Sequence, residues 1–291
     1  MLETRELTIR FGGHVAVDNV SCEFAPGTLT AIVGPNGAGK TTYFNLISGQ
    51  LRASDGTVWL DGVDITRESV SARTHRGLGR AFQLTQLFPN LSVLENVRLA
   101  VQSRRREGLS LFSVWLDRKD TLVRARALVE RVRLGDRADA PASSLPHGDQ
   151  RKLEVAMLIA LEPSVYMFDE PTAGMSVDDV PVILDLIRSL KAEADKTILL
   201  VEHKMDVVGE LADRIIVLHN GQLVADGEPG EVIASPIVQQ AYLGLAPEAS
   251  LLGDPGPSPG IRLQAAMGRP PIRAFPLEGE GERRDPSGRR A

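Results

Sequence analysis

Apolar residues in the first part of the chain come in short runs rather than at helical spacing. L-T-I-R-F at 7–11 and T-L-T-A-I-V at 28–33 are typical of β-strands, and a P-G pair at 26–27 marks a turn before the second run. A further strand-like run, T-V-W-L-D-G, follows at 57–62. The pattern predicts a small N-terminal β region.

From about residue 92 to 163 the apolar positions recur at helical spacing, for example in T-L-V-R-A-R-A-L-V-E-R-V. The apolar runs V-Y-M-F at 165–168 and T-I-L-L-V at 197–201 then flank a helix-like segment at 178–192. Such runs are typical of strands that helices cover on both faces of a parallel sheet. An N-G pair at 220–221 between two strand-like runs indicates a hairpin.

The composition changes after about residue 244. Residues 245–291 are rich in proline, glycine and arginine and show little apolar periodicity, so we expect a largely disordered tail. A dispensable tail is favoured here over a partner-binding one.

Charge and composition narrow the classes of protein. The 291 residues are 43% apolar and carry a net charge of −5, which gives no reason to expect a nucleic-acid partner. The single cysteine, Cys22, excludes an internal disulfide and fits a reducing cytoplasm. No run approaches the roughly 20 apolar residues that cross a bilayer, and the N-terminus lacks an export signal. We therefore expect membrane contact only through a partner.

A phosphate-binding loop is the strongest motif in the chain. G-P-N-G-A-G-K-T at 34–41 matches G-x-x-x-x-G-K-[ST] in full, between a predicted strand and a predicted helix. Its glycines allow backbone N–H groups to turn toward phosphate oxygens, and the helix N-terminus adds a positive dipole end. Lys40 is expected to bridge the outer phosphates and the Thr41 hydroxyl to complete the Mg²⁺ shell, so ATP and Mg²⁺ are the expected ligands.

A pair of carboxylates follows the apolar run at 165–168. We expect Asp169 to hold Mg²⁺ through water and Glu170 to orient and partly deprotonate the attacking water. Alone, an Asp-Glu pair at a strand end is usually a solvated corner. Together with the phosphate loop, it predicts a catalytic base.

These motifs resemble the ATP-binding subunits of ABC transporters, and the resemblance covers residues 2–244. It implies that Phe11 stacks against adenine, although a core aromatic is an almost equally good interpretation. It implies that Gln83, in G-R-A-F-Q, contacts Mg²⁺ and the water, and that His203, in V-E-H-K, contacts the γ-phosphate. Alone, these two would be a surface amide and a structural histidine. The expected nucleotide-contacting residues are Phe11, Val17, Gly34, Pro35, Asn36, Gly37, Ala38, Gly39, Lys40, Thr41, Thr42 and Gly148.

The resemblance also implies the fold and the domains. We expect an α/β P-loop NTPase (RecA-like) core with an N-terminal antiparallel β subdomain and an inserted helical subdomain at about 84–163. The ATPase domain is expected to span residues 1–244, and the tail 245–291.

Two segments resemble motifs that face a second ATPase subunit in this family. P-T-A-G-M-S at 171–176 corresponds to the D-loop, although Ser176 replaces the acidic residue common there. L-P-H-G-D-Q, which begins at Leu145, resembles the signature L-S-G-G-Q, which faces ATP on the opposite subunit. Gly148 is retained, but Pro146 stands in place of the serine. One or two charge-assisted hydrogen bonds, each worth roughly 1.5–3 kcal/mol, are therefore expected to be missing.

A weakened signature has a consequence for assembly, since each signature serves the partner's ATP. A heterodimer keeps one strong site, with Lys40 and Glu170, whereas a homodimer has two weakened sites. We therefore expect a second, related ATPase subunit as the partner, in a heterodimer rather than a homodimer.

Finer resemblance indicates the type of transporter. The segments G-L-G-R-A-F-Q-L-T-Q-L-F-P-N-L-S-V-L-E-N-V and V-E-H-K-M-D-V-V, the insert at 102–120 and the V-Q-Q-A-Y-L-G segment resemble branched-chain amino acid importers, in particular the LivG type. Such a subunit is expected to lie on the cytoplasmic face of the inner membrane, bound to two membrane permeases and served indirectly by an external substrate-binding protein. The basic run at 104–106 indicates either a solvated helix face or contact with a permease or headgroups.

Other interpretations remain open at this point. Urea or amide importers and lipopolysaccharide-type exporters share the Y-L-G segment. Soluble ABC ATPases that act on ribosomes or DNA generally carry two cassettes, coiled coils or zinc inserts, and none is indicated here. A regulatory subunit with little turnover is disfavoured by Glu170 and His203.

Overall fold

The larger sheet forms the centre of the chain. The computed structural model describes residues 1–81, 87–104, 118–236 and 238–239. From one edge to the other, the larger sheet contains β10 (Gln222–Gly227), β9 (Arg214–His219), β3 (Leu29–Val33), β8 (Thr197–Val201), β7 (Val165–Asp169) and β6 (Leu78–Arg80). All pairs are parallel except β9 and β10, which form the hairpin that the N-G pair predicts.

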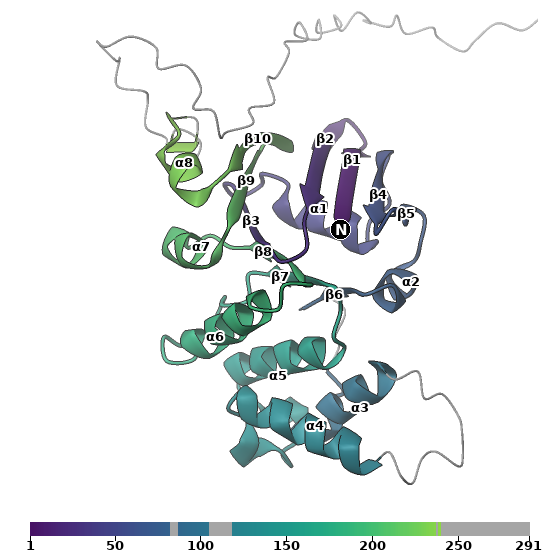
Figure 1. Cartoon of the computed structure of the whole chain (residues 1–291), viewed down its shortest axis with the longest axis vertical. Helices are drawn as coiled ribbons and strands as arrows, with labels where there is room; N and C mark the ends of the chain where they lie inside the picture. The colour runs from purple at the N-terminus through teal and green to yellow at the C-terminus, as the bar shows by residue number, and fades with distance from the viewer. Residues whose placement is uncertain (82–86, 105–117, 237, 240–291) are drawn as a thin grey trace, which may run out of the picture.

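The smaller sheet is antiparallel, as the family resemblance implies. Its strands, in spatial order, are β2 (His14–Phe24), β1 (Leu2–Phe11), β4 (Asp55–Leu60) and β5 (Val63–Asp64). Helix α1 (Lys40–Ser48) lies beside this sheet (Figure 1) and shares a buried apolar cluster with both sheets.

The helices occupy separate parts of the molecule. Figure 1 shows α3, α4 and α5 grouped at the end away from the smaller sheet, and these three helices contact one another. The helices after α1 are α2 (Val70–His75), α3 (Val93–Arg104), α4 (Arg118–Arg131), α5 (His147–Ala160), α6 (Val180–Lys191), α7 (Met205–Leu211) and α8 (Pro229–Ala234), with 3-10 turns at Gly135–Arg137 and Ala142–Ser144. Among the described residues, none of the helices is both long and apolar enough to span a bilayer.

The central strands are buried on both faces. In β7, Val165 and Met167 join the cluster that contains α1, whereas Tyr166 and Phe168 join the cluster that contains α5 and α6. This alternation follows from the period of two in a strand, and it explains why the run at 165–168 is apolar throughout. Covered on both sides, the strand end that carries Asp169 is held rigidly.

The main predicted strands and helices are present, but the run at 28–33 lies in the larger sheet as β3 rather than in the N-terminal β region. The short elements β5, α2, α7 and α8 were not predicted. The short strand β6 was not predicted, because three residues are too few to show a period. The predicted boundary between residues 244 and 245, the tail, and most of the insert at 102–120 lie outside the described residues. The division into domains therefore stays a prediction.

Candidate functional site

The phosphate-binding loop connects the end of β3 to the start of α1. Gly39 adopts φ +97° and caps α1, and a Cβ there would lie 2.5 Å from the carbonyl oxygen of Ala16. Gly34 has φ +153°, and its Cβ would lie 2.2 Å from the carbonyl oxygen of Leu218. Only glycine fits at these two positions, so the strand-to-helix turn requires the motif residues that define it.

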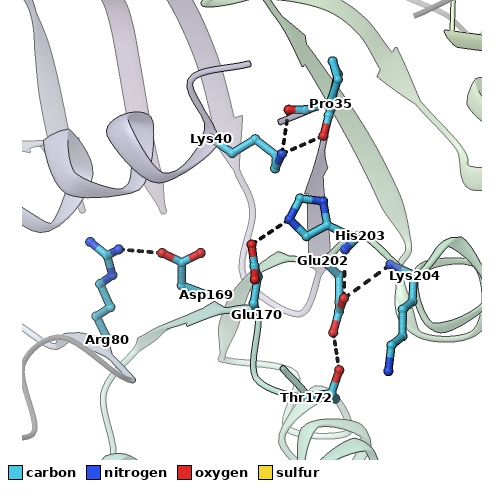
Figure 2. Close-up of polar contacts among 10 residues, drawn as sticks. Pro35, Lys40, Arg80, Asp169, Glu170, Thr172, Glu202, His203 and Lys204 are labelled. Carbon is cyan, nitrogen blue, oxygen red and sulfur yellow. Dashed lines mark hydrogen bonds and ion pairs between the residues drawn. The ribbon is translucent and has the colours of Figure 1, made fainter. Parts of the chain in front are cut away.

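Lys40 lies at the first position of α1 and is buried, with 6% of the residue exposed. Its Nζ donates to the carbonyl oxygens of Gly34 at 2.6 Å and Pro35 at 3.0 Å (Figure 2). Burial lowers the pKa of Lys40 from its usual value, and the negative charges of Glu170 and Asp169 oppose that change. The ammonium is therefore held inside the loop and close to both carboxylates.

The other loop residues differ in exposure. Asn36 and Gly37 are exposed, Ala38 is buried, and Pro35 is half-buried. In α1, Thr41 is exposed and Thr42 is half-buried. An exposed hydroxyl at the start of the helix is open to an entering ligand, as the Mg²⁺ prediction for Thr41 requires.

Glu170 follows directly after β7, with a left-handed φ of +50° and a backbone N–H that donates to the carbonyl oxygen of Val201. Its Oε1 lies 2.6 Å from Nε2 of His203, which follows β8 (Figure 2). Because β7 and β8 are parallel neighbours, their carboxyl ends lie side by side. The predicted base, Glu170, and the histidine predicted to contact the γ-phosphate, His203, are therefore brought together at this end of the sheet.

Asp169 forms a buried ion pair that the sequence did not predict. The guanidinium of Arg80, at the end of β6, lies 2.8 Å from its Oδ2. The same guanidinium donates to the side chains of Asn45 and Ser48 in α1 and lies over the ring of Phe44. The Arg80 side chain is fully buried, so these contacts fix Asp169 against the helix that follows the phosphate-binding loop.

The segment that resembles the signature opens α5. Pro146 takes the N-cap position with φ −55° and ψ 156° and supplies no side-chain hydrogen bond. His147 is exposed and Gly148 is half-buried in the first turn. Thus a helix does begin there without a hydroxyl cap, as the sequence predicts.

Ion pairs connect this helix to the segment after β7. Lys152, which is buried, pairs with Asp149 at 3.0 Å and also with Asp179. The Ser176 hydroxyl donates to Asp179 Oδ2 at 2.7 Å. The D-loop-like segment 171–176 is thus joined to the start of α5 within one chain.

Comparison with known proteins decides the family. A model of the ABC transporter family matches residues 17–173, more than half of the chain. The chain belongs to the ABC transporter family. This ABC chain is similar to the branched-chain amino acid transport ATP-binding proteins LivG of Escherichia coli K12, with 36% identity over 84% of this chain and 98% of the relative, and BraF of Pseudomonas aeruginosa, with 34% identity over the same shares.

Solved ABC cassettes agree with the fold of this ABC chain. The ATP-binding cassette MJ1267 in its ADP conformation has a TM-score of 0.70 and 30% identity over 84% of this chain and 99% of that one. The dimeric cassette MJ0796 has a TM-score of 0.69 and 25% identity over 79% of this chain and 99% of that one. The matches confirm the family, the α/β P-loop fold and the class of ATPase that the sequence indicates.

Two further predicted residues, Phe11 and Val17, lie in the smaller sheet. Phe11 is 50% exposed at the end of β1, so the alternative of a core aromatic is wrong. The prediction that Val17 contacts the nucleotide is wrong for this structure, because Val17 is fully buried. Its Cγ2 lies 3.6 Å from where a Cβ on Gly39 would be, so the side chain packs against the phosphate-binding loop. Gln83 lies outside the described residues, and its role stays a prediction.

Two buried charged residues in the ABC site were missed by sequence reasoning. Arg80 directly follows Gly79 in a strand too short to recognise, although a charge in L-G-R-A-F was a usable signal. Glu202 directly follows the apolar run at 197–201 and is 3% exposed. A carboxylate that continues a buried strand needs donors, and that requirement was the available signal.

Proposed function

We propose that this chain is the ATP-hydrolysing subunit of a branched-chain amino acid importer. The observation that carries the proposal is the convergence of Lys40, Glu170 and His203 at one edge of the larger sheet (Figure 2). The cargo is supported by the names of LivG and BraF, which this chain matches over nearly their whole length.

The residues around the loop fit ATP and Mg²⁺. The backbone N–H groups of the loop and the buried ammonium of Lys40 suit phosphate oxygens, because both are N–H donors. Thr41, Asp169 and Gln83 offer the oxygen ligands that Mg²⁺ prefers, Asp169 through water, and Phe11 offers an exposed ring for adenine. A bound Mg²⁺ supplies charge neutralisation between phosphate oxygens.

Each side chain of the chain itself has a distinct task. When ATP binds, the Lys40 ammonium donates to phosphate oxygens instead of the loop carbonyl oxygens. It thereby compensates the negative charge that develops as the γ-phosphoryl group is transferred to water. Glu170 orients the water and accepts its proton, and His203 keeps the Glu170 carboxylate directed by its 2.6 Å contact before it engages the γ-phosphate.

The start of α5 supports a proposal for the assembly. Since Pro146 supplies no hydroxyl, this chain offers its partner a signature with fewer donors than the usual one. We therefore propose a heterodimer with a second ABC ATPase, bound to two membrane permeases on the cytoplasmic face of the inner membrane. An external substrate-binding protein then delivers the amino acid.

The central test compares activity and uptake in matched variants. We expect Glu170→Gln to lower the ATPase rate of the assembled complex by about 10²- to 10⁴-fold, because it removes the proton acceptor. We expect Lys40→Ala to abolish ATP binding. The control is Glu193→Gln, which makes the same chemical change at an exposed position after α6. Cells that lack this chain should lose uptake of radiolabelled leucine.

The outcomes separate the parts of the proposal. Unchanged ATP hydrolysis in Lys40→Ala would refute the assigned nucleotide site. Normal leucine uptake without the chain, together with loss of urea or amide uptake, would keep the ATPase and replace the cargo.

A further inference from the structure

A buried carboxylate lies beside the proposed catalytic residues without belonging to them. Glu202 ends the apolar run of β8 and is 3% exposed. It neither contacts Lys40 nor belongs to the predicted ligands of ATP or Mg²⁺. Burial of a carboxylate is costly unless hydrogen bonds replace the lost water, so its contacts indicate what it does.

Glu202 connects two loops that follow neighbouring strands. Its Oε1 accepts from the hydroxyl of Thr172 at 2.6 Å, in the segment after β7. Its Oε2 accepts from the backbone N–H groups of His203 at 2.8 Å and Lys204 at 3.4 Å, in the segment after β8 (Figure 2). The carboxylate thus bridges the D-loop-like segment and the histidine loop.

These contacts close a ring that includes the proposed base, Glu170. Thr172 is two residues after Glu170, its hydroxyl contacts Glu202, and Glu202 is followed by His203. His203 then returns to Glu170 through its 2.6 Å contact. A displacement of any one member is therefore transmitted to the others through two short hydrogen bonds and two short stretches of backbone.

Burial makes the ring stiff. Thr172 is 2% exposed, so the hydroxyl-to-carboxylate bond is shielded from water and is of the short, charge-assisted kind. The half-exposed side chains of Glu170 and His203, at 39% and 38%, have no such protection of their own. Their relative position depends on the buried pair behind them.

We propose that Glu202, through Thr172, is a positioning residue that couples the 171–176 segment to His203. The inference rests on the proposed function, in which Glu170 primes water, His203 engages the γ-phosphate and the 171–176 segment faces the partner ATPase. Dimer closure against that segment shifts Thr172, and Glu202 passes the shift to the backbone of His203. The partner's approach thus sets the alignment of the histidine in this chain's own site.

Substitution at Thr172 tests the coupling with little change in shape. Thr172→Val removes the hydroxyl at nearly constant volume, and Thr172→Ser retains it. Thr30→Val is the matched control, because the Thr30 hydroxyl is buried in β3 and finds no hydrogen-bond partner within the described part of the chain. For each variant, the complex is purified through a tag on this chain, and kcat, KM for ATP and Tm are measured.

The expected result is a loss in kcat alone. Thr172→Val should lower kcat by about 10- to 100-fold, since small displacements of reacting groups cost rates of this order. KM should stay within about twofold, because the phosphate-binding loop is untouched. Thr172→Ser should restore most of the rate, and Thr30→Val should leave it unchanged.

Several results would overturn the coupling. A kcat of Thr172→Val within twofold of the original does so, as does a lower Tm with a normal kcat well below that Tm, which would show a structural role only. Equal losses in Thr172→Ser and Thr172→Val also exclude the hydroxyl as the link.

A second variant covers the case in which Thr172→Val does not fold. Glu202→Gln keeps one oxygen acceptor and the shape of the side chain, so a reduced kcat at constant KM supports the coupling and an unchanged kcat refutes it. Lys40→Ala in the same assay separates the two proposals. If it abolishes turnover while the Thr172 and Glu202 variants are normal, the coupling fails and the ATPase function stands.

Discussion

This chain contributes two surfaces to the proposed ATP sites, and they are built differently: the strand-end half serves its own ATP, whereas the signature half at the start of α5 serves the partner's ATP. At the strand ends, charged side chains have buried partners: Lys40 has two carbonyl oxygens, and Arg80 holds Asp169. At the start of α5, Pro146 offers no side-chain hydrogen bond and His147 is exposed. The difference teaches that the strand-end half is organised by buried contacts within this chain, whereas the signature half begins with exposed residues and has no side-chain cap.

The largest expected effect is the loss of stability when the ion pair between Arg80 and Asp169 in the strand-end half is removed. We expect Arg80→Met to destabilise the chain by about 3–5 kcal/mol, because the Asp169 carboxylate, whose side chain is only 10% exposed, loses its charged partner. Chemical unfolding of the purified chain measures this loss.

Arg10→Met is the control, since Arg10 pairs with Asp55 on the surface with side-chain exposures of 48% and 65%. That change should cost less than about 1 kcal/mol. Equal losses in the two variants would show that the strand-end half does not depend on its buried pair.

A serine at position 146 tests whether the signature half is weakened by its missing hydroxyl. Pro146→Ser should raise the ATPase rate of the assembled complex by about tenfold, which corresponds to about 1.4 kcal/mol from one recovered hydrogen bond to a charged group. The rate is measured at saturating ATP, with Pro141→Ser as the control at a proline that precedes a 3-10 turn. An unchanged rate in Pro146→Ser would contradict the weakened signature and the asymmetric dimer.

The smallest expected effect concerns Glu154, in the second turn of α5. Burial raises the pKa of Glu154 to about 7, and Arg151, 3.7 Å away, only partly opposes this. A pKa raised on folding stabilises the chain below the unfolded value of 4.5, and that contribution is lost as the pH rises through 7. Glu154→Gln should therefore gain stability relative to the original chain as the pH rises.

The gain between pH 5 and pH 8 should be about 1 kcal/mol, because the side chain is 18% exposed and the full shift does not apply. Urea unfolding at several pH values measures it, with exposed Glu193→Gln as the control. A constant difference between Glu154→Gln and the original chain across this range would exclude Glu154 as the titrating group.

Local motifs explain how much of the site the sequence predicts. Gly34 to Thr41 act within one strand-to-helix turn, so their spacing alone carries the geometry, and Asp169 and Glu170 follow a strand that is apolar throughout. The contact between Glu170 and His203 was not stated in advance, although the parallel order of β7 and β8 produces it.

Long-range pairs explain the rest. Arg80 and Asp169 are 89 residues apart, and Thr172 and Glu202 are 30 apart, so each pair depends on which strands become neighbours in the sheet. Neither β6 nor the order β8-β7-β6 leaves a periodic trace in the sequence. Phe11 shows the same limit, since an aromatic residue at a strand end has no pattern that separates exposure from burial.

The hydrogen bonds of Lys40 to its own loop bear on the conformation of the loop without nucleotide. In the proposed site, a phosphate that binds Lys40 competes with the carbonyl oxygens of Gly34 and Pro35, because the ammonium already has these two acceptors. In that proposed site, Lys40 keeps hydrogen-bond acceptors in both states: the two carbonyl oxygens before the nucleotide binds and phosphate oxygens afterwards. These internal hydrogen bonds stabilise the loop without nucleotide, and they form again when the products leave the proposed site.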